Sequence, residues 1–488
     1  MYSKQLSELL PLFGIDEAPD VLITDLCIDS RKASTGSLFL AYPGSNNDGR
    51  DFIRAAIENG AVAVLYESIA FEELQGLPVP AFGVAGLMRK VGAVASAFFD
   101  HPSHELQVFG VTGTNGKTTC AYLLTQAFEL LGMKSAFIGT LGIGAVSSIR
   151  TATHTTPDPI SLQRTLAQLL SEGVTQVSME VSSHALHQGR VAGVEFYGVM
   201  FTNLTQDHLD YHATMDDYGA AKARLFTDFE SKLAVINAQD TFGATLLDKA
   251  VSEFIVSYGE TSGDVYSEDL SLDTQGITFT ACTENVDFDV VTPLIGSVNL
   301  PNLLLVAATL LSLSTPIDQI RSIFTKLKPA PGRMELFTKA KFPQLVVDYA
   351  HTPDALAKAI DSVRHHCKGK LWCVFGCGGD RDRAKRALMG AAAGSADQIV
   401  ITNDNPRSED PQDIANEILA GMNDVQSAIH VELDRAAAIR YAVSHASPDD
   451  WILVAGKGHE TTQTIGSQVL DFSDREFAQA LLNEEVGK

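Results

Sequence analysis

The sequence predicts an α/β protein with three domains: a small α/β N-terminal domain, a central P-loop-type domain with a mostly parallel sheet, and a Rossmann-like doubly wound C-terminal domain. Its 488 residues exceed what a single hydrophobic core usually holds. From residue 104 onward, β-like and helix-like segments alternate, as they do in parallel sheets covered by helices. Turn-rich stretches at 101–103 and 329–332 divide the chain into domains 1–103, 104–331 and 332–488.

The first block carries short strand patterns and one clear helix pattern. Strands are expected at 21–28, 37–42 and 61–66, and a helix is expected at 51–59. This mixture predicts the small α/β domain.

Composition restricts the kind of partner. Lys and Arg number 36 against 60 Asp and Glu, which gives a formal charge of −24. This balance argues against nucleic acid or an anionic membrane as the main partner. The longest apolar stretch, 302–313, is too short to span a bilayer, and the N-terminus M-Y-S-K-Q-L-S-E-L-L-P lacks the apolar core of a signal peptide. We expect a cytoplasmic protein.

The six cysteines lack the paired spacing of a metal site. We expect reduced thiols in cores and loops, as is usual in the cytoplasm. They are Cys27, Cys120, Cys282, Cys367, Cys373 and Cys377.

Residues 109–120, F-G-V-T-G-T-N-G-K-T-T-C, have the pattern of a phosphate-binding loop between a strand at 106–111 and a helix at 120–131. Backbone N–H groups at the helix start would hold phosphates, Lys117 would reach the β and γ oxygens, and Thr118 could ligate Mg²⁺. The strict pattern G-x-x-x-x-G-K-[ST] would require glycine where the chain has Val111. An ordinary glycine turn is the less favoured alternative. The loop predicts a nucleotide without choosing among motors, switches, kinases and ligases.

Acidic and histidine side chains follow the next two expected strands, at 176–181 and 198–202, the first of which comes after a helix at 161–172. Glu180, in M-E-V-S-S-H, would be a natural Mg²⁺ ligand, although a solvated strand-end glutamate is an equal alternative. The second strand runs into T-N-L-T-Q-D-H-L-D-Y-H. Its density of acids and histidines favours a metal or phosphate role.

Lys222 lies among alanines in Y-G-A-A-K-A-R-L-F, on an expected helix. One interpretation is a surface lysine lying over apolar neighbours. The other is a lysine near the metal whose amine is modified to a carbamate, which would turn a cation into a metal-binding anion. The sequence leaves both open.

The last block alternates strands, expected at 345–349, 371–375, 398–402, 429–431 and 451–454, with amphipathic helices. Each strand ends in a polar or glycine-rich loop, where ligands of doubly wound sheets collect. Arg407, in D-N-P-R, has a guanidinium fork suited to a carboxylate, and Glu460, in A-G-K-G-H-E, could pair with an ammonium group. An Arg and a Glu aimed at one pocket would suit an amino acid.

The ordered set of motifs covers nearly the whole chain. It comprises I-D-S-R-K-A-S-T-G-S-L-F-L-A, G-T-N-G-K-T-T, T-T-P-D-P, M-E-V-S-S-H, T-N-L-T-Q-D-H-L-D-Y-H, A-A-K, G-R-M-E and D-Y-A-H-T-P-D-A-L. This set resembles the Mur ligase family, the ATP-dependent amide-forming enzymes of peptidoglycan precursor synthesis. The resemblance implies that UDP-N-acetylmuramoyl-L-alanyl-D-glutamate and meso-2,6-diaminopimelate are the substrates, and we expect a monomer.

The resemblance also implies a nucleotide and metal site. The residues that would hold ATP are Gly113, Thr114, Asn115, Gly116, Lys117, Thr118, Thr119, Asn302, Arg333 and Asp348. Thr118, Glu180 and His208 would bind Mg²⁺, and Lys222 would carry a carbamate derived from CO₂. Lys117, Glu180, His208 and Lys222 form the expected catalytic set.

Two substrate sites are implied in the same way. The UDP-muramoyl residues would be Ile28, Ser30, Ser45, Asn46, Asn47, His154, Thr155, Thr156, Ser182, Gln188 and Arg190. His154 is a local departure, since we expect Asn at this position in relatives. The diaminopimelate residues would be Arg381, Asp404, Asn405, Pro406, Arg407, Gly456 and Glu460.

The implied reaction moves the γ-phosphoryl group of ATP to the D-glutamyl side-chain carboxylate, and an amine then attacks the acyl phosphate. We expect domain closure to assemble the site. The alternatives are the same chemistry with L-lysine, a folylpolyglutamate-type ligase, an NTPase switch or motor, and a catalytically silent binding protein. D-N-P-R has no explanation in a folylpolyglutamate-type ligase.

Overall fold

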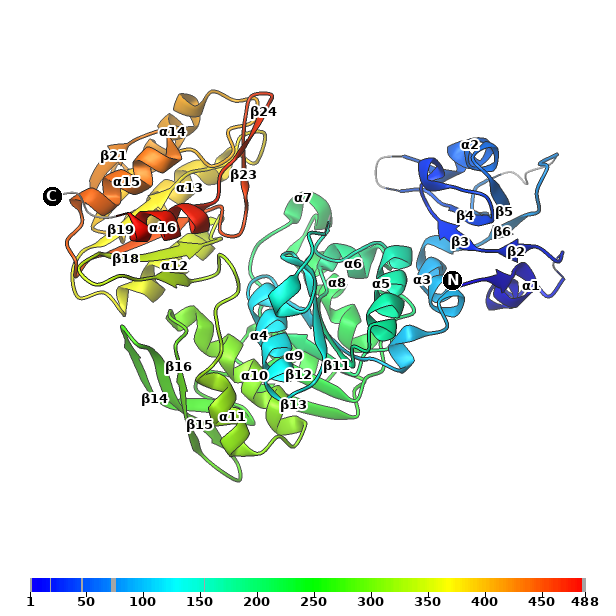
Figure 1. The fold of residues 1–488 in the computed structure, drawn as a ribbon, viewed down its shortest axis with the longest axis horizontal. Coiled ribbons are helices and arrows are strands. Elements are labelled where there is room, and N and C mark those ends of the chain that lie inside the picture. Colours follow the sequence, from blue (N-terminus) through cyan, green and yellow to red (C-terminus); the bar gives the residue numbers. More distant parts are fainter. Residues whose placement is uncertain (1, 18, 45–46, 72–75, 153, 485–488) are drawn as a thin grey trace. The chain divides into compact units, whose positions relative to one another are not determined.

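The computed structural model describes residues 2–17, 19–44, 47–71, 76–152 and 154–484. The chain divides into two compact units. The first comprises Met1–Ile236 and Asp240–Val256, and the second comprises Asn237–Gln239 and Ser257–Lys488. Each unit is described by itself, with its elements labelled as in Figure 1.

The first unit begins with a parallel sheet of four strands in the order β3-β4-β5-β6. They span Asp25–Cys27, Ser37–Ala41, Ala61–Glu67 and Ala81–Val84. Helix α3 (Leu87–Phe98) packs on one face and α2 (Ile53–Glu58) on the other (Figure 1). The small α/β domain and its expected helix are confirmed.

The single strand expected at 21–28 is wrong in detail. Leu22–Ile23 forms β2, which pairs with β1 (Lys4–Gln5), whereas β3 pairs with β4. The break falls at Thr24, whose N–H donates to the Gly36 carbonyl at 2.9 Å. The chain therefore passes from one sheet to another within a segment that the sequence predicts as one strand.

The rest of this unit contains parallel strands in the order β12-β11-β7-β10-β8, with short β9 antiparallel at the edge. The strands span Gln107–Thr112 (β7), Ser135–Gly139 (β8), Gly142–Gly144 (β9), Gln176–Glu180 (β10), Gly198–Phe201 (β11) and Leu233–Asn237 (β12). Helices α4 (Lys117–Leu130), α5 (Pro159–Ser171), α6 (Ser183–His187), α7 (Leu209–His212), α8 (Met215–Thr227) and α9 (Thr241–Leu247) complete the unit. The expected strands and helices around the glycine-rich loop are confirmed.

The second unit opens with an antiparallel meander that the sequence pattern did not reveal. Its strands are β14 (Val265–Asp273), β15 (Gly276–Thr283) and β16 (Phe288–Thr292), and β13 (Phe254–Tyr258) spans the boundary between the units. The apolar stretch near 302–313 forms α10 (Leu300–Ser312), most of which is buried; α11 (Ile317–Phe324) follows. Among the described helices, none has the length and apolar character needed to cross a membrane.

A six-stranded sheet in the order β17-β18-β22-β19-β20-β21 ends the chain, parallel except for β17. Its strands span Glu335–Phe337 (β17), Gln344–Asp348 (β18), Leu371–Phe375 (β19), Gln398–Ile401 (β20), Ala428–Val431 (β21) and Trp451–Ala455 (β22). Helices α12 (Pro353–Arg364), α13 (Ala384–Ala393) and α14 (Pro411–Leu419) pack on one face, and α15 (Arg435–His445) and α16 (Asp474–Asn483) on the other. The doubly wound prediction is confirmed. A hairpin, β23 (Thr462–Ile465) and β24 (Gln468–Asp471), was not predicted.

A fully buried ion pair lies between two helices of this last domain. The Arg435 guanidinium donates from Nε and Nη2 to the two carboxylate oxygens of Asp474, both at 2.7 Å, and neither side chain is exposed. It also donates to the carbonyls of Asn403, after β20, and Ala455, at the end of β22. The pair therefore joins two helices to the carboxyl ends of two strands.

We expect Arg435→Met to lower the free energy of unfolding by about 3–5 kcal/mol, because Asp474 is left as an uncompensated buried charge. Both tryptophans of the chain, Trp372 and Trp451, lie in this sheet, so their fluorescence during urea unfolding reports on this domain. The control is Arg440→Met on the same helix, whose pair with Glu484 is half exposed and should cost less than about 1 kcal/mol. Equal effects of the two substitutions would contradict the role given to Arg435.

Candidate active site

The glycine-rich loop follows β7 and leads directly into α4. Gly113 has φ +148°, and a Cβ atom added to it would lie 1.9 Å from Thr202 Oγ1, so only glycine fits against the end of β11. Gly116 is left-handed and precedes Lys117, the first residue of α4. The loop therefore leads directly into the N-terminus of α4, the end of a helix at which phosphates commonly bind.

The chain after β11 fixes the shape of this loop. Asn203 accepts the Asn115 N–H at its side-chain oxygen (2.9 Å) and the Thr114 N–H at its carbonyl (2.8 Å). Thr202 Oγ1 donates to the Asn115 carbonyl at 2.6 Å. Thr202 and Asn203 support the loop although sequence reasoning assigned them no role; their place at the end of a strand beside the loop was the available signal.

Two lysines converge on one carbonyl oxygen of the loop. Lys117 Nζ donates to the Gly113 oxygen at 2.8 Å, and Lys222 Nζ donates to the same oxygen at 2.7 Å. Lys222 is 1% exposed and lies over the Tyr218 ring, 4.3 Å from its centroid. Burial, together with the Lys117 charge, lowers the pKa of Lys222 well below its usual value, although Asp207 opposes this. The surface-lysine interpretation of Lys222 is therefore wrong.

Glu180 ends β10 and is 1% exposed. Its Oε2 accepts the Thr118 hydroxyl at 2.9 Å, and its Oε1 accepts the Thr140 N–H at 2.7 Å. The alternative of a solvated glutamate is excluded. Among the described residues, no three His, Cys, Asp or Glu side chains are grouped to hold a metal ion by themselves. Mg²⁺ commonly takes one or two carboxylates and shares substrate phosphates, so the Thr118–Glu180 oxygen pair beside a phosphate loop fits it.

His208, the third expected metal residue, is linked to the glycine-rich loop through Tyr218. It precedes α7 in a left-handed conformation, and its ring contacts His184 and Tyr218 at centroid distances of 4.9 and 6.1 Å. The Tyr218 hydroxyl lies 3.2 Å from Thr114 Oγ1 in the loop. Burial is the main cause that lowers the pKa of His208, and the charges of Lys117 and Lys222 lower it further. A neutral imidazole is the form that binds metals.

Four of the expected UDP-muramoyl residues form one network next to Glu180. Thr156 Oγ1 donates to the Glu180 carbonyl at 2.9 Å and accepts the Ser182 N–H at 3.2 Å. Arg190 donates to the Thr156 carbonyl at 2.9 Å and to the Gln188 side-chain oxygen at 2.8 Å. The structure thus connects these residues to the backbone of Glu180, whose carboxylate lies beside the loop.

The other described members lie near this network or in the N-terminal domain. Thr155 Oγ1 lies 3.0 Å from Thr140 Oγ1, and His154 precedes it as an exposed residue. Ile28, Ser30 and Asn47 are in the N-terminal domain. Ser45 and Asn46 lie outside the described residues.

Sequence reasoning gave Tyr42 no role. Burial, aided by the Asp158 charge and opposed by Arg190, raises its pKa to about 12.

The second unit holds the remaining expected nucleotide residues. The Arg333 guanidinium lies over the Tyr349 ring, 4.4 Å from its centroid. Asp348 accepts the N–H groups of Met334 and Ala350, at 2.8 and 2.9 Å; burial raises the pKa of its carboxyl, whereas Arg333 and these donors oppose the rise. Asn302 lies in α10, where its amide donates to the Val298 carbonyl at 3.1 Å.

The D-N-P-R turn follows β20 and is interlocked with the loop after β19. Gly379 N–H donates to the Asn405 carbonyl at 2.9 Å, and Arg407 Nη1 donates to the Gly379 carbonyl at 2.7 Å. A Cβ at Gly379 would lie 1.9 Å from the Pro406 carbonyl oxygen. Among the described residues, no hydrogen bond reaches Nε or Nη2 of Arg407. Two thirds of its fork therefore remain for a carboxylate.

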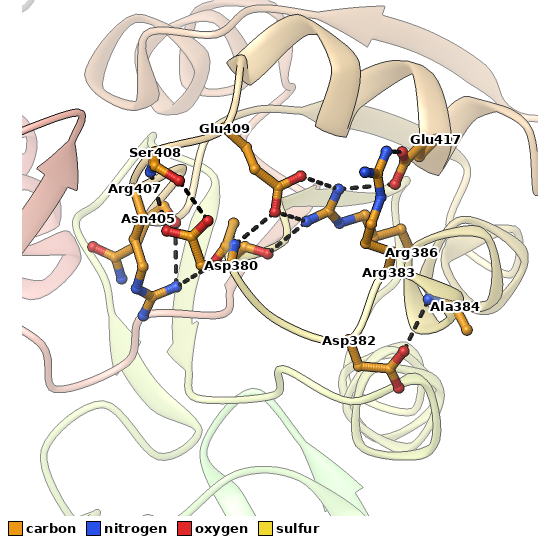
Figure 2. A network of polar contacts seen from close by, with 12 residues as sticks. Asp380, Asp382, Arg383, Ala384, Arg386, Asn405, Arg407, Ser408, Glu409 and Glu417 are labelled. Carbon is orange, nitrogen blue, oxygen red and sulfur yellow. Dashed lines mark hydrogen bonds and ion pairs between the residues drawn. The ribbon is translucent and has the colours of Figure 1, made fainter. Parts of the chain in front are cut away.

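A buried arginine that sequence reasoning missed links these two loops (Figure 2). Arg386 is not exposed; it pairs with Glu409 at 2.7 Å and Glu417 at 2.8 Å and donates to the Gly378 carbonyl. The Arg386 hydrogen bonds are the main cause that lowers the pKa of Glu409 to about 2. The segment G-C-G-G-D-R-D-R-A-K-R contains both arginines. A site role was expected for Arg381, which is exposed, and none for the buried Arg386.

Glu460 lies next to the D-N-P-R turn, as expected. Its Oε2 accepts the Asn405 side-chain N–H at 2.9 Å. Gly456 approaches Asp404 so closely that an added Cβ would lie 2.8 Å from Asp404 Oδ2. The structure therefore gathers Asp404, Asn405, Pro406, Arg407, Gly456 and Glu460 at the carboxyl ends of β20 and β22, with Arg381 on the neighbouring loop.

Three family models match consecutive parts of the chain. The Mur ligase middle domain matches residues 111–310, and the Mur ligase glutamate ligase domain matches residues 332–458. The domain described as the Mur ligase family catalytic domain matches residues 22–99.

Three individual proteins are similar over nearly their whole length. The UDP-N-acetylmuramoyl-L-alanyl-D-glutamate--2,6-diaminopimelate ligases of Coxiella burnetii and Xylella fastidiosa are 44% and 46% identical to this chain, covering 99% and 98% of it and 100% and 97% of themselves. A solved structure of a ligase with the same name is 33% identical, with a TM-score of 0.74 and 99% of both chains covered. The chain therefore belongs to the Mur ligase family.

Proposed function

We propose that this protein is the ATP-dependent ligase that joins meso-2,6-diaminopimelate to the D-glutamate side-chain carboxylate of UDP-N-acetylmuramoyl-L-alanyl-D-glutamate, in the cytoplasm, during peptidoglycan precursor synthesis. The observation that carries this proposal is full-length similarity to ligases of that name, at 44% identity over 99% of the chain. The N-terminal family match at 22–99 and the D-N-P-R turn favour it over a folylpolyglutamate-type ligase.

The phosphates of ATP would lie on the loop between Gly113 and Thr119. Lys117 Nζ rests on loop carbonyls at 2.8 Å, so it can turn to the β and γ oxygens without leaving the loop. Bound Mg²⁺ would supply charge neutralisation at these oxygens. Thr118 and Glu180 are hydrogen-bonded to each other at the start of α4 and the end of β10, so both oxygens are already oriented toward one place.

The D-glutamyl carboxylate would attack the γ-phosphorus of ATP and give an acyl phosphate and ADP. The amine of diaminopimelate would then attack the acyl carbon, and inorganic phosphate would leave as the amide forms. Lys117 in the loop and Arg190 in the network next to Glu180 would orient the anionic reactants, because this chemistry depends mainly on positioning and charge.

Phosphate release should require both UDP-N-acetylmuramoyl-L-alanyl-D-glutamate and meso-diaminopimelate. With ¹⁸O in the D-glutamyl carboxylate, one label should appear in the released phosphate, because the acyl phosphate oxygen leaves with it. Lys117→Ala should lower kcat by about 10³-fold, since one positioned cation is removed from the transferred group. Release from ATP alone would indicate an NTPase and contradict the proposal.

We also propose that Lys222 carries a carbamate. Its support is local: a buried amine with a lowered pKa has a neutral fraction that can attack CO₂. Conversion to an anion would also relieve the approach of two ammonium groups to the Gly113 carbonyl.

With ¹³C-labelled bicarbonate, the wild-type protein should give a carbamate carbon signal by NMR, and Lys222→Arg should not. Lys232→Arg is the control, since Lys232 is exposed and should leave the signal intact. Lys222→Ala should lose activity by about 10²-fold or more and regain part of it with added bicarbonate. A wild-type signal that survives in Lys222→Arg would exclude this assignment.

The preference for diaminopimelate over L-lysine is assigned to Arg407. Its free Nε and Nη2 would receive the carboxylate at the far end of diaminopimelate, which lysine lacks. Gly379 holds the third nitrogen, so the fork is fixed before the substrate arrives.

Arg407→Ala should lower kcat/KM for meso-diaminopimelate by about 10²-fold and leave kcat/KM for L-lysine within about threefold, because only the first substrate loses a charge-assisted pair. Arg383→Ala is the matched control: Arg383 is exposed and pairs with Glu417. The measurement is amide formation with each amino acid. An unchanged ratio between the two substrates would remove Arg407 from specificity.

A further inference from the structure

Lys457 is a buried cation with no role in the site described so far. It follows β22 in the segment A-G-K-G-H-E, and its side chain is not exposed. Its Nζ donates to Glu460 Oε2 at 2.9 Å and to the Thr462 carbonyl at 2.6 Å. A buried ammonium group persists only where such partners compensate its charge.

Among the described residues, Glu460 accepts hydrogen bonds at only one of its two carboxylate oxygens. Its Oε2 receives both the Lys457 ammonium and the Asn405 amide, each at 2.9 Å. Within the described part of the chain, no hydrogen bond reaches its Oε1, and 33% of the side chain is exposed. One carboxylate oxygen is therefore fixed by the protein, and the other can accept a hydrogen bond from a cationic partner.

The same lysine anchors the hairpin that supports Arg407. Thr462, which accepts from Lys457, is the first residue of β23. Two residues later, Thr464 donates to the Asn405 side-chain oxygen at 2.9 Å and accepts the Arg407 N–H at 3.1 Å. Lys457 is thus connected to both charged groups of the amino-acid site.

We propose that Lys457 is a positioning residue for the incoming amino acid: it fixes Glu460 Oε2 so that Oε1 receives an ammonium group while Arg407 takes a carboxylate. This inference rests on the proposed function, since it assumes an amino acid at this site. Lys457 itself does not contact the substrate. The competing interpretation is a lysine that stabilises the loop and has no effect on substrate recognition.

Lys457→Met keeps the length of the side chain and removes its charge. We expect KM for meso-diaminopimelate to rise by about 10-fold, because Glu460 is no longer held in its receiving orientation. KM for ATP and for the UDP-muramoyl substrate should stay within about twofold. Lys358→Met is the matched control, since Lys358 pairs with Asp354 on the surface of α12 and should change none of these constants. An equal rise in KM for all three substrates, or no rise for any of them, would overturn the proposal.

A double-mutant cycle with Glu460→Gln separates positioning from general destabilisation. If Lys457 acts through Glu460, adding Lys457→Met to Glu460→Gln should change KM for meso-diaminopimelate by less than about twofold. A further 10-fold rise in the double variant would show that the two residues act independently. If Lys457→Met does not fold, Lys457→Gln enters the same cycle and is judged by the same two outcomes.

Crystal structures of wild-type and Lys457→Met protein distinguish failure of this inference from failure of the proposed function. Wild-type protein without diaminopimelate-dependent turnover would refute the function. The position of Glu460 would still decide the inference: we expect its carboxylate to leave the Asn405 amide in the variant. A carboxylate in the same place with the same Asn405 bond would refute positioning by Lys457.

Discussion

The parallel pairing of β7 with β10 on one side and β11 on the other is the constraint on which the proposed nucleotide site depends. Glu180 lies opposite Val111, and Phe201 lies opposite Thr112, so all three strands end at one level. A shift of either register by one residue would turn the strand-end side chains to the opposite face. The glycine-rich loop, the buried carboxylate and the bracing residues Thr202 and Asn203 meet because the sheet requires their strands to end together.

The formal net charge of −24 does not reveal where the buried cations of this protein lie. Two ammonium groups approach one carbonyl beside the loop, and burial keeps the pKa of Lys222 low there. In the second unit the buried cations are paired: Arg435 with Asp474, and Arg386 with Glu409. Such pairs gain little net stability over apolar packing, yet each one ties a loop at a strand end to a helix. In this protein these ion pairs fix the positions of the strand-end loops.

Local patterns predicted the parallel strands, the phosphate loop and the doubly wound sheet, because alternation and glycine-rich turns are properties of neighbouring residues. Two other features were missed because they depend on partners far away in the sequence. In G-C-G-G-D-R-D-R-A-K-R the arginines look alike, but Arg381 is exposed while Arg386 is buried between two glutamates from α14 and the turn before it. Thr24 likewise divides the strand expected at 21–28, because its N–H donates to the Gly36 carbonyl.

The amino-acid site of the proposed ligase follows the same logic, since recognition requires a cation and an anion at a fixed separation. Arg407 has a positive φ of 51°, a conformation that non-glycine residues hold only when their surroundings impose it. Here Thr464 and Gly466 of the hairpin pair with its backbone, and Gly379 accepts from its side chain. In the proposed ligase, a substrate with a carboxylate and an ammonium group at the matching separation would satisfy both ends. L-Lysine would leave the Arg407 guanidinium without its partner, and we expect discrimination because the Gly379 carbonyl restrains that group.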